Sequence, residues 1–216
     1  MGAKELDVVI TMIAVILVIM LWIMLYDSNR FVVRHYSLRD QRIKKSVKAV
    51  VLADLHNKRY GKENVRLLQA IDEIGPDMIL IAGDMLTAKP KATLDVAVGF
   101  LTELAKKYPV YYGNGNHEHR LKLYPENYGD MAGRYEEALT KIGIHRLVNE
   151  HKDLPEYGIC IYGSEIDRLY YKRFGIQPMA PEYLPGILGQ PSEEYFNILI
   201  AHDPDYFPKY ADWGAD

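Results

Sequence analysis

One run near the N-terminus limits how this chain can fold more than any other feature. "VVITMIAVILVIMLWIMLY", residues 8–26, carries no charged side chain and only two hydroxyl groups, those of Thr11 and Tyr26. As a helix, a run of this length would extend about 28 Å, close to the thickness of a bilayer's hydrocarbon core. We therefore expect a transmembrane anchor at residues 8–26, with an N-terminal tail at 1–7 and a juxtamembrane segment at 27–46.

Two other interpretations of this run are a cleaved signal peptide and a buried core helix. No small-x-small cleavage site follows, because the next residues are Asp27, Ser28, Asn29 and Arg30, and the run is longer than a typical signal-peptide apolar region. An unbroken apolar run at a chain terminus would also be an unusual core helix. The uncleaved anchor is the favoured interpretation.

The orientation of the anchor is predicted from the basic residues around it. Six Lys or Arg side chains follow the run before residue 47, whereas Lys4 alone precedes it. By the positive-inside rule the protein crosses the cell membrane once, with the following domain in the cytoplasm. The alternative is that these charges belong to the surface of a folded domain that is exported regardless of them.

Composition excludes several kinds of site. The chain contains a single cysteine, Cys160, so it holds no intrachain disulfide and no multi-cysteine zinc site. We interpret Cys160, which lies in the apolar stretch "YGICIYG", as a small core side chain. The net charge is −3, and a nucleic-acid partner is not expected. Metal chemistry must therefore use His, Asp, Glu and Asn.

From residue 47 onward, apolar runs of strand length alternate with stretches of helical spacing. The expected strands cover residues 47–53, 77–82 and 109–113, and the expected helices 63–74, 93–108 and 128–143, the last of them ending at Gly143. This α/β alternation predicts a largely parallel sheet covered by helices, in one domain spanning residues 47–216.

The last third of the chain has a different pattern. "YGICIYG" and "YFNILIAH" are strand-like, but residues 177–191 between them contain four prolines. Such a segment is expected to form neither a helix nor a central strand. Because it also carries apolar side chains, we predict an irregular excursion that packs near a site or a membrane.

Four of the predicted strands end in potential ligands. These are Asp54 and His56, Asp84, Asn116 with His117, and His202. Each residue alone has an ordinary interpretation as a helix cap, a turn former or a core histidine, but the carboxyl ends of strands in α/β sheets are where ligands bind. Carboxylate, imidazole and amide ligands without thiolates suit Mn²⁺, Fe or Zn²⁺.

The motifs "DLHN", "GDM", "GNHEH" and "AHDPD", in this order and each after a hydrophobic strand, resemble those of the calcineurin-like metallophosphoesterase superfamily. The resemblance is strongest to its membrane-anchored bacterial phosphodiesterases of the YkuE and YaeI type. It implies an α/β/β/α sandwich and a hydrolase that uses two divalent metal ions and a bridging hydroxide on phosphodiester or phosphomonoester bonds. The substrate is expected to be a phosphoester, and a lipid-linked phosphoester is one candidate.

The resemblance also implies a role for each motif residue. The metal ligands would be Asp54, His56, Asp84, Asn116 and His202, with Asp84 bridging both ions. His117 would be the catalytic residue beside the substrate phosphate, and Asn57 and His119 would contact substrate. Two alternatives stay open: hydrolysis of a UDP-diacylglucosamine-type pyrophosphate in lipid A synthesis, and a catalytically inactive membrane-tethered binding domain.

Two expectations concern the motifs themselves. The stretch 113–119 is predicted to be a loop in which Gly113 and Gly115 allow a tight turn, and Glu118 orders it through backbone hydrogen bonds. The family pattern closes with G-H-x-H, whereas the fourteen residues after His202 include no histidine. We therefore expect the C-terminal part of the sandwich to be missing from this sequence.

Overall fold

The computed structural model describes residues 2–172 and 175–216. Met1, part of the predicted N-terminal tail, lies outside these residues. The chain divides into two compact units, Met1–Leu38 and Arg39–Asp216. We describe each unit by itself.

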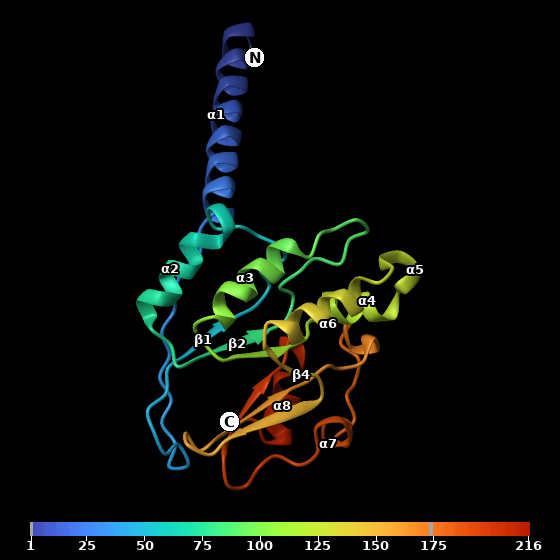
Figure 1. Cartoon of the computed structure of the whole chain (residues 1–216). Helices are drawn as coiled ribbons and strands as arrows, with labels where there is room; N and C mark the ends of the chain where they lie inside the picture. The colour runs from blue at the N-terminus through green and yellow to red at the C-terminus, as the bar shows by residue number, and fades with distance from the viewer. Residues whose placement is uncertain (1, 173–174) are drawn as a thin grey trace. The chain divides into compact units, whose positions relative to one another are not determined.

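The first unit is dominated by helix α1, Ala3–Ser28 (Figure 1). Its stretch Lys4–Ser28 is long and apolar enough to cross a membrane, and none of its most apolar window is buried by other parts of the chain. The interpretation as a buried core helix is therefore wrong. A polypeptide helix with apolar side chains on every face needs an apolar environment, which a bilayer supplies.

The second unit is built on two sheets. Sheet A is parallel, with strand order β1-β2-β3-β4, and in sheet B β5-β6-β7 pair antiparallel and then parallel. The strands are β1 Ala49–Leu52, β2 Met78–Ala82, β3 Val110–Gly113, β4 His145–Leu147, β5 Glu150–Leu154, β6 Ile159–Gly163 and β7 Phe196–Ile200. The largely parallel sheet and both C-terminal strands are confirmed, while β4 and β5 were not anticipated.

The two sheets pack face to face. One cluster of buried side chains joins them, with Met78, Leu80 and Tyr111 from sheet A against Ile161 and Phe196 from sheet B. Side chains alternate along a strand, so the intervening residues of β2 and β3 point to the other face of sheet A, where they are also buried. Both faces of sheet A are therefore covered.

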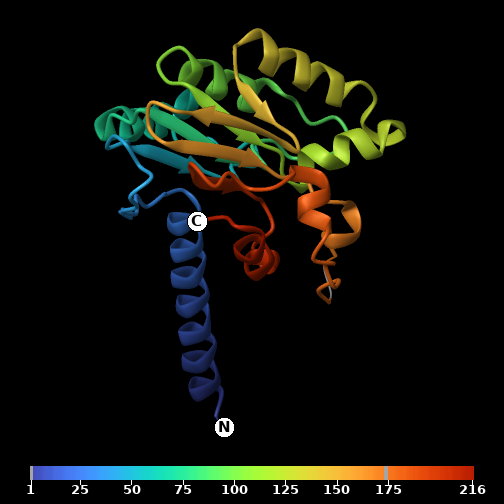
Figure 2. The same cartoon turned by 90° about the horizontal axis from the view of Figure 1, so that it is seen from below.

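Helices cover the outer faces of both sheets, with α2, α3 and α6 on one side and α8 on the other (Figure 2). The helices of this unit are α2 Val65–Ile74, α3 Asp95–Ala105, α4 Asn116–Leu123, α5 Pro125–Tyr128, α6 Met131–Lys141, α7 Tyr183–Leu188 and α8 Phe207–Trp213, with 3₁₀ turns at Lys62–Asn64, Arg168–Tyr170 and Pro204–Tyr206. The layers are those of a mixed α/β sandwich.

Helical spacing explains why these segments pack as they do. Met131, Tyr135 and Leu139 of α6 recur every four residues and are all buried. The helix ends at Lys141, and Gly143 with a φ of +81° takes the left-handed conformation that follows many helices, as predicted.

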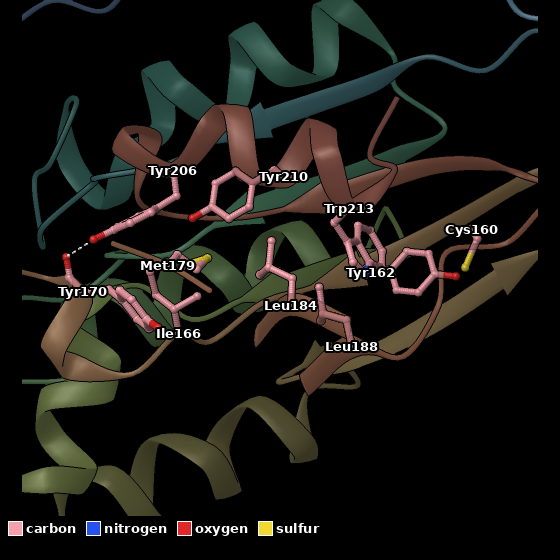
Figure 3. Close-up of a cluster of buried hydrophobic side chains, with 10 residues drawn as sticks. All are labelled: Cys160, Tyr162, Ile166, Tyr170, Met179, Leu184, Leu188, Tyr206, Tyr210 and Trp213. Carbon is pink, nitrogen blue, oxygen red and sulfur yellow. Dashed lines mark hydrogen bonds between the residues drawn. The ribbon is translucent and has the colours of Figure 1, made fainter. Parts of the chain in front are cut away.

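The proline-rich excursion is more ordered than predicted. Residues Tyr183–Leu188 form helix α7, so the expectation that this segment contains no helix is wrong. Pro185 is tolerated because it is the third residue of the helix, where the missing N–H has no intrahelical partner. Figure 3 shows Leu184, Leu188 and Met179 packed with Tyr162, Tyr206 and Trp213 in one buried cluster. The segment is therefore packed rather than disordered, as expected, and its position near a site or a membrane stays a prediction.

Candidate metal centre

The loops that follow β1 and β2 run side by side at one edge of sheet A. The backbone N–H groups of Asp54, His56 and Asn57 donate to the carbonyls of Gly83, Asp84 and Met85 respectively, at 3.1, 2.9 and 3.0 Å. The pairing of the strands thus continues past their ends. It holds Asp54 and His56 next to Asp84.

The backbone of these loops is locally strained. Asp54, His56, Asn57 and Asp84 all have φ between +48° and +58°. Left-handed conformations are uncommon for residues with a Cβ and cluster at functional sites, where surrounding contacts maintain them. The hydrogen bonds between the two loops are such contacts.

Asp84 lies at the centre of the cluster, with its side chain 3% exposed. Its Oδ2 is 3.3 Å from His202 Nε2, 3.7 Å from His56 Nε2 and 3.9 Å from His117 Nε2, and Asp54 Oδ1 is 3.3 Å from His56 Nε2. Residues that follow the ends of β1, β2, β3 and β7 therefore converge on one carboxylate.

The stretch predicted to be a loop begins a helix instead. Asn116 is the first residue of α4, and His117 lies in the first turn. Glu118 accepts N–H groups from Asp84 (2.9 Å), Met85 (3.0 Å) and Gly115 (3.0 Å) and the hydroxyl of Tyr112. A carboxylate in the first turn satisfies amides that have no helical partner. The predicted ordering role of Glu118 is confirmed.

A glycine is needed at position 115 because Asp84 lies very close to its Cα, not because the backbone turns there. Its φ of −98° and ψ of −174° are extended, which any residue adopts, so the predicted tight turn is wrong at this position. A Cβ on Gly115 would overlap the Asp84 carboxylate and lie 2.6 Å from its backbone nitrogen. At Gly113 a Cβ would lie 2.6 Å from Ile200 Cγ2.

Gly115→Ala should therefore damage the site while leaving the rest of the fold in place. We expect divalent-metal affinity to fall at least about tenfold, because the methyl group displaces Asp84, with a loss of about 1–3 kcal/mol in stability from overpacking. Isothermal titration with Mn²⁺ and thermal melts would measure both effects. The matched control is Gly99→Ala in α3, where a Cβ meets nothing within 4 Å and alanine favours the helix. Unchanged affinity in Gly115→Ala would contradict the close approach.

Asn116 provides a test of whether the cluster fits a metal. Its Oδ1 is buried and accepts no hydrogen bond from any group in the described residues. An unpaired buried carbonyl oxygen is costly, and coordination to a cation would satisfy it. Two overlapping groups of donor atoms, each within 4.8 Å of one another, meet at Asp84: His56 with His117, and Asp54 with His202. The donor set fits divalent metal ions.

His202 and His117 make opposite hydrogen bonds through Nδ1. His202 Nδ1 lies 2.8 Å from the carbonyl of Ala82, which can only accept, so Nδ1 carries the proton and a neutral ring leaves the Nε2 lone pair free. His117 Nδ1 instead accepts the N–H of Ala88 at 2.7 Å, so its neutral ring carries the proton on Nε2. His202 is thus arranged to bind a metal and His117 to donate a hydrogen bond.

Charge and burial shift the pKa values of these groups. Burial acts to lower the pKa of His202, but the hydrogen bond to and the charge of Asp84 outweigh it and raise the pKa to about 9. Burial acts to raise the pKa of Asp84. The hydrogen bond to and the charge of His202, together with the backbone N–H of His117, outweigh this effect, and the pKa of Asp84 is lowered overall. Burial lowers the pKa of His117 despite the charge of Asp84. A protonated His202 therefore balances Asp84 in the metal-free chain.

The two predicted substrate-contacting residues lie at the edge of the cluster. Asn57 donates from Nδ2 to the carbonyl of Thr93 at 3.4 Å, while its buried Oδ1 has no partner among the described groups. His119 lies on α4 with its ring 6.5 Å from the ring of Tyr171, and burial lowers its pKa. His119 does not belong to either of the two donor groups found among the described residues.

Further polar residues near the site were missed in the sequence. Asn114 Nδ2 donates to Glu165 at 2.6 Å, and Lys122 Nζ lies 3.1 Å from the same carboxylate. Glu165 follows the end of β6, so the rule that ligands gather at strand ends could have found it. The ring of Tyr171, 6.3 Å from that of His202, comes from an irregular segment in which no sequence signal marks it.

The whole arrangement agrees with a known family. Residues 47–216 match the family model of the calcineurin-like phosphoesterases. The chain belongs to the calcineurin-like phosphoesterase family. The matched range includes all the motif residues from Asp54 to His202. The match confirms the predicted superfamily and fold class. The finer assignment to the YkuE and YaeI type stays a prediction.

Two curated proteins illustrate the similarity of this calcineurin-like phosphoesterase domain to others. An uncharacterized metallophosphoesterase of Campylobacter jejuni is 33% identical over 79 residues, which cover 36% of this chain and 21% of the relative. A transmembrane protein with a metallophosphoesterase domain from Danio rerio is 27% identical over 165 residues, 73% of this chain and 35% of the relative. The chain thus spans about a third or less of the length of these relatives.

Proposed function

We propose that this chain is a membrane-anchored hydrolase of phosphoester bonds, acting on phosphodiesters or phosphomonoesters with two divalent metal ions. The observation that carries the proposal is the gathering of ligands from four strands around Asp84, together with the unpaired Asn116 Oδ1. Family membership supports the reaction class. Mn²⁺, Fe or Zn²⁺ are the candidate ions, since the ligands are carboxylates, imidazoles and an amide.

In this proposal each ligand has a separate task. As the family resemblance implies, Asp54 and His56 would hold one ion, Asn116 and His202 would hold the other, and Asp84, which both donor groups share, would contribute to both. When bound, such a pair of ions lowers the pKa of water, polarises the phosphoryl oxygens and aligns an in-line displacement. Glu118 holds the backbone of Asp84 and Met85 next to that of Gly115, the residue before Asn116, through its three backbone hydrogen bonds. Ligand positions fixed in this way reduce the reorganisation needed during reaction.

His117 acts on the substrate in this proposal. Its Nε2–H faces the Asp84 side of the site, with Nδ1 fixed by the N–H of Ala88. A phosphoryl or leaving-group oxygen placed there would accept a hydrogen bond from Nε2 and then its proton. Asn57 and His119, at the edge of the cluster, would contact the remainder of the substrate.

The location of the domain is also part of the proposal. Helix α1 is apolar enough to cross a membrane, and a relative from Danio rerio is named a transmembrane protein. We place the protein in the cell membrane as a single-pass protein. The basic residues that follow α1 support a cytoplasmic catalytic domain, which is part of this proposal.

The test of this function is Mn²⁺-dependent hydrolysis of bis-p-nitrophenyl phosphate by the detergent-extracted chain. It is measured for residues 1–216 and for a form continued through a G-H-x-H segment. Turnover that chelation removes and Mn²⁺ restores supports the hydrolase. Absence of metal binding and of turnover in both forms would overturn it and favour the inactive tethered binding domain.

The raised pKa of His202 predicts how metal affinity depends on pH. Below about pH 9 His202 is protonated in the metal-free chain and must lose its proton to bind a metal. Mn²⁺ affinity should therefore rise with pH, by up to about tenfold per unit between pH 7 and 8.5. Titration calorimetry in buffers of different ionisation enthalpy would count the released protons. Affinity that does not change over this range, with no proton release, would contradict the Asp84–His202 pairing.

A further inference from the structure

Exposed apolar side chains gather beside the candidate metal centre. In the described part of the second unit, six large hydrophobic residues are exposed: Val51, Val65, Leu123, Leu169, Ile176 and Phe207. Isolated exposed hydrophobics are normal on a protein surface. Three of these six, however, lie on the segments that follow β6 and β7. We call Leu169, Ile176 and Phe207 the apolar rim.

The segments of the apolar rim leave the sheet at the same edge as the metal ligands. Strands β6 and β7 are parallel, and His202, just beyond the end of β7, lies 3.3 Å from Asp84. Phe207 comes five residues after His202 and begins α8. Leu169 is two residues before Tyr171, whose ring is 6.3 Å from that of His202. Leu169 and Phe207 therefore lie on segments that begin at the metal edge, and Ile176 lies further along the segment that carries Leu169.

Hydrogen bonds of one buried tyrosine fix the backbone next to the three rim residues. The hydroxyl of Tyr206 donates to the carbonyl of Gln177 at 3.0 Å and lies 3.4 Å from the carbonyl of Tyr170 (Figure 3). Each of these three residues is a chain neighbour of one rim residue. Leu169, Ile176 and Phe207 are nevertheless 48%, 62% and 71% exposed. The chain thus fixes the backbone under these side chains and leaves the side chains themselves without a cover.

Resting on the proposed function, we infer that the substrate is an amphiphilic phosphoester whose hydrocarbon portion contacts Leu169, Ile176 and Phe207. A phosphoester held at the Asp84 centre must extend a substituent away from the metal ligands, and the two segments that carry the apolar rim begin at that edge. Helix α1 favours hydrocarbon over a protein as the occupant, because it fixes the domain at a membrane, where amphiphilic esters are concentrated.

The experiment compares methyl p-nitrophenyl phosphate with dodecyl p-nitrophenyl phosphate, using the full chain in nanodiscs with Mn²⁺. We expect kcat/KM for the dodecyl ester to exceed that for the methyl ester by about tenfold or more, mainly through KM. Ile176→Ser with Phe207→Ser should bring this ratio toward one and leave the rate with the methyl ester unchanged. The control is Val65→Ser at the start of α2, an exposed apolar residue outside the apolar rim.

The outcomes separate this inference from the proposed function. If neither ester is hydrolysed by this chain or by the form continued through a G-H-x-H segment, the proposed function itself fails. If the methyl ester is hydrolysed but the ratio is near one, or is as high in the rim variant as in the unaltered chain, the amphiphilic substrate is wrong and the hydrolase stands. If the rim variant changes only the oligomeric mass measured by sedimentation, the apolar rim is a contact between copies, and the inference is overturned.

Discussion

Asp84→Asn is expected to abolish metal binding and phosphoester hydrolysis without unfolding the chain. Asn has the shape of Asp, and its side-chain oxygen can still accept the backbone N–H of His117, at 2.8 Å in this structure. The substitution removes the negative charge around which three histidines gather. In the proposed function a pair of ions would provide several kcal/mol of transition-state stabilisation, so the rate should fall by about 10³-fold or more. Titration with Mn²⁺ and assays of bis-p-nitrophenyl phosphate hydrolysis would measure both losses.

The control for Asp84→Asn is the same substitution at an exposed carboxylate. Asp72 on α2 binds Lys107 and Tyr108 at the surface and takes no part in the cluster. Asp72→Asn should leave metal binding and turnover at the level of the unaltered chain. Circular dichroism melts would show that both variants fold. Retention of full activity in Asp84→Asn would remove Asp84 from its bridging position.

His117→Gln is expected to lower turnover far more than metal content. The Nδ1 of His117 is occupied by the Ala88 N–H, so this side chain is arranged to donate to substrate rather than to bind an ion. Loss of a positioned acid costs about 10²–10⁴ in kcat, whereas the number of bound ions should not change. Steady-state kinetics and elemental analysis of metal content separate the two effects.

A second measurement distinguishes the proposed role of His117 from a ligand role. Nitrogen-15 NMR of the imidazole should show a proton on Nε2 and none on Nδ1, while His202 should carry its proton on Nδ1 when metal is bound. His151→Gln, at an exposed position of β5, serves as the kinetic control. If His117→Gln loses metal as well as turnover, His117 is a ligand and the acid assignment fails.

Much of the fold could be predicted because its signals are local. Apolar runs at β2, β3, β6 and β7 are continuous, as expected for buried parallel strands, and helices such as α6 show regular spacing. Strands β4 and β5 were missed because they are short or mostly exposed, as in "EHKDL" of β5, and lack an apolar pattern. Helix α4 was missed because "NHEHRLKL" has almost no apolar side of its own and is held by Glu118.

For the site, the sequence could predict which residues follow the strand ends, but not the hydrogen-bond partners of those residues. The rule that loops at one sheet edge converge indicated Asp54, His56, Asp84 and His202, and these side chains do meet. The Nδ1 partners of His117 and His202 could not be predicted, because they are backbone groups brought close by tertiary structure. The same holds for Asn114 and Glu165, which are 51 residues apart and hydrogen-bonded.

The central claim is that Asp84 bridges two metal ions, and electron paramagnetic resonance of the Mn²⁺-loaded chain tests it most directly. Two Mn²⁺ ions about 3.5–4 Å apart should give an exchange-coupled signal at two bound ions per chain. The account predicts this signal in the unaltered chain and its loss in Asp84→Asn. A six-line signal of isolated Mn²⁺ at saturation, or no bound Mn²⁺, would contradict it.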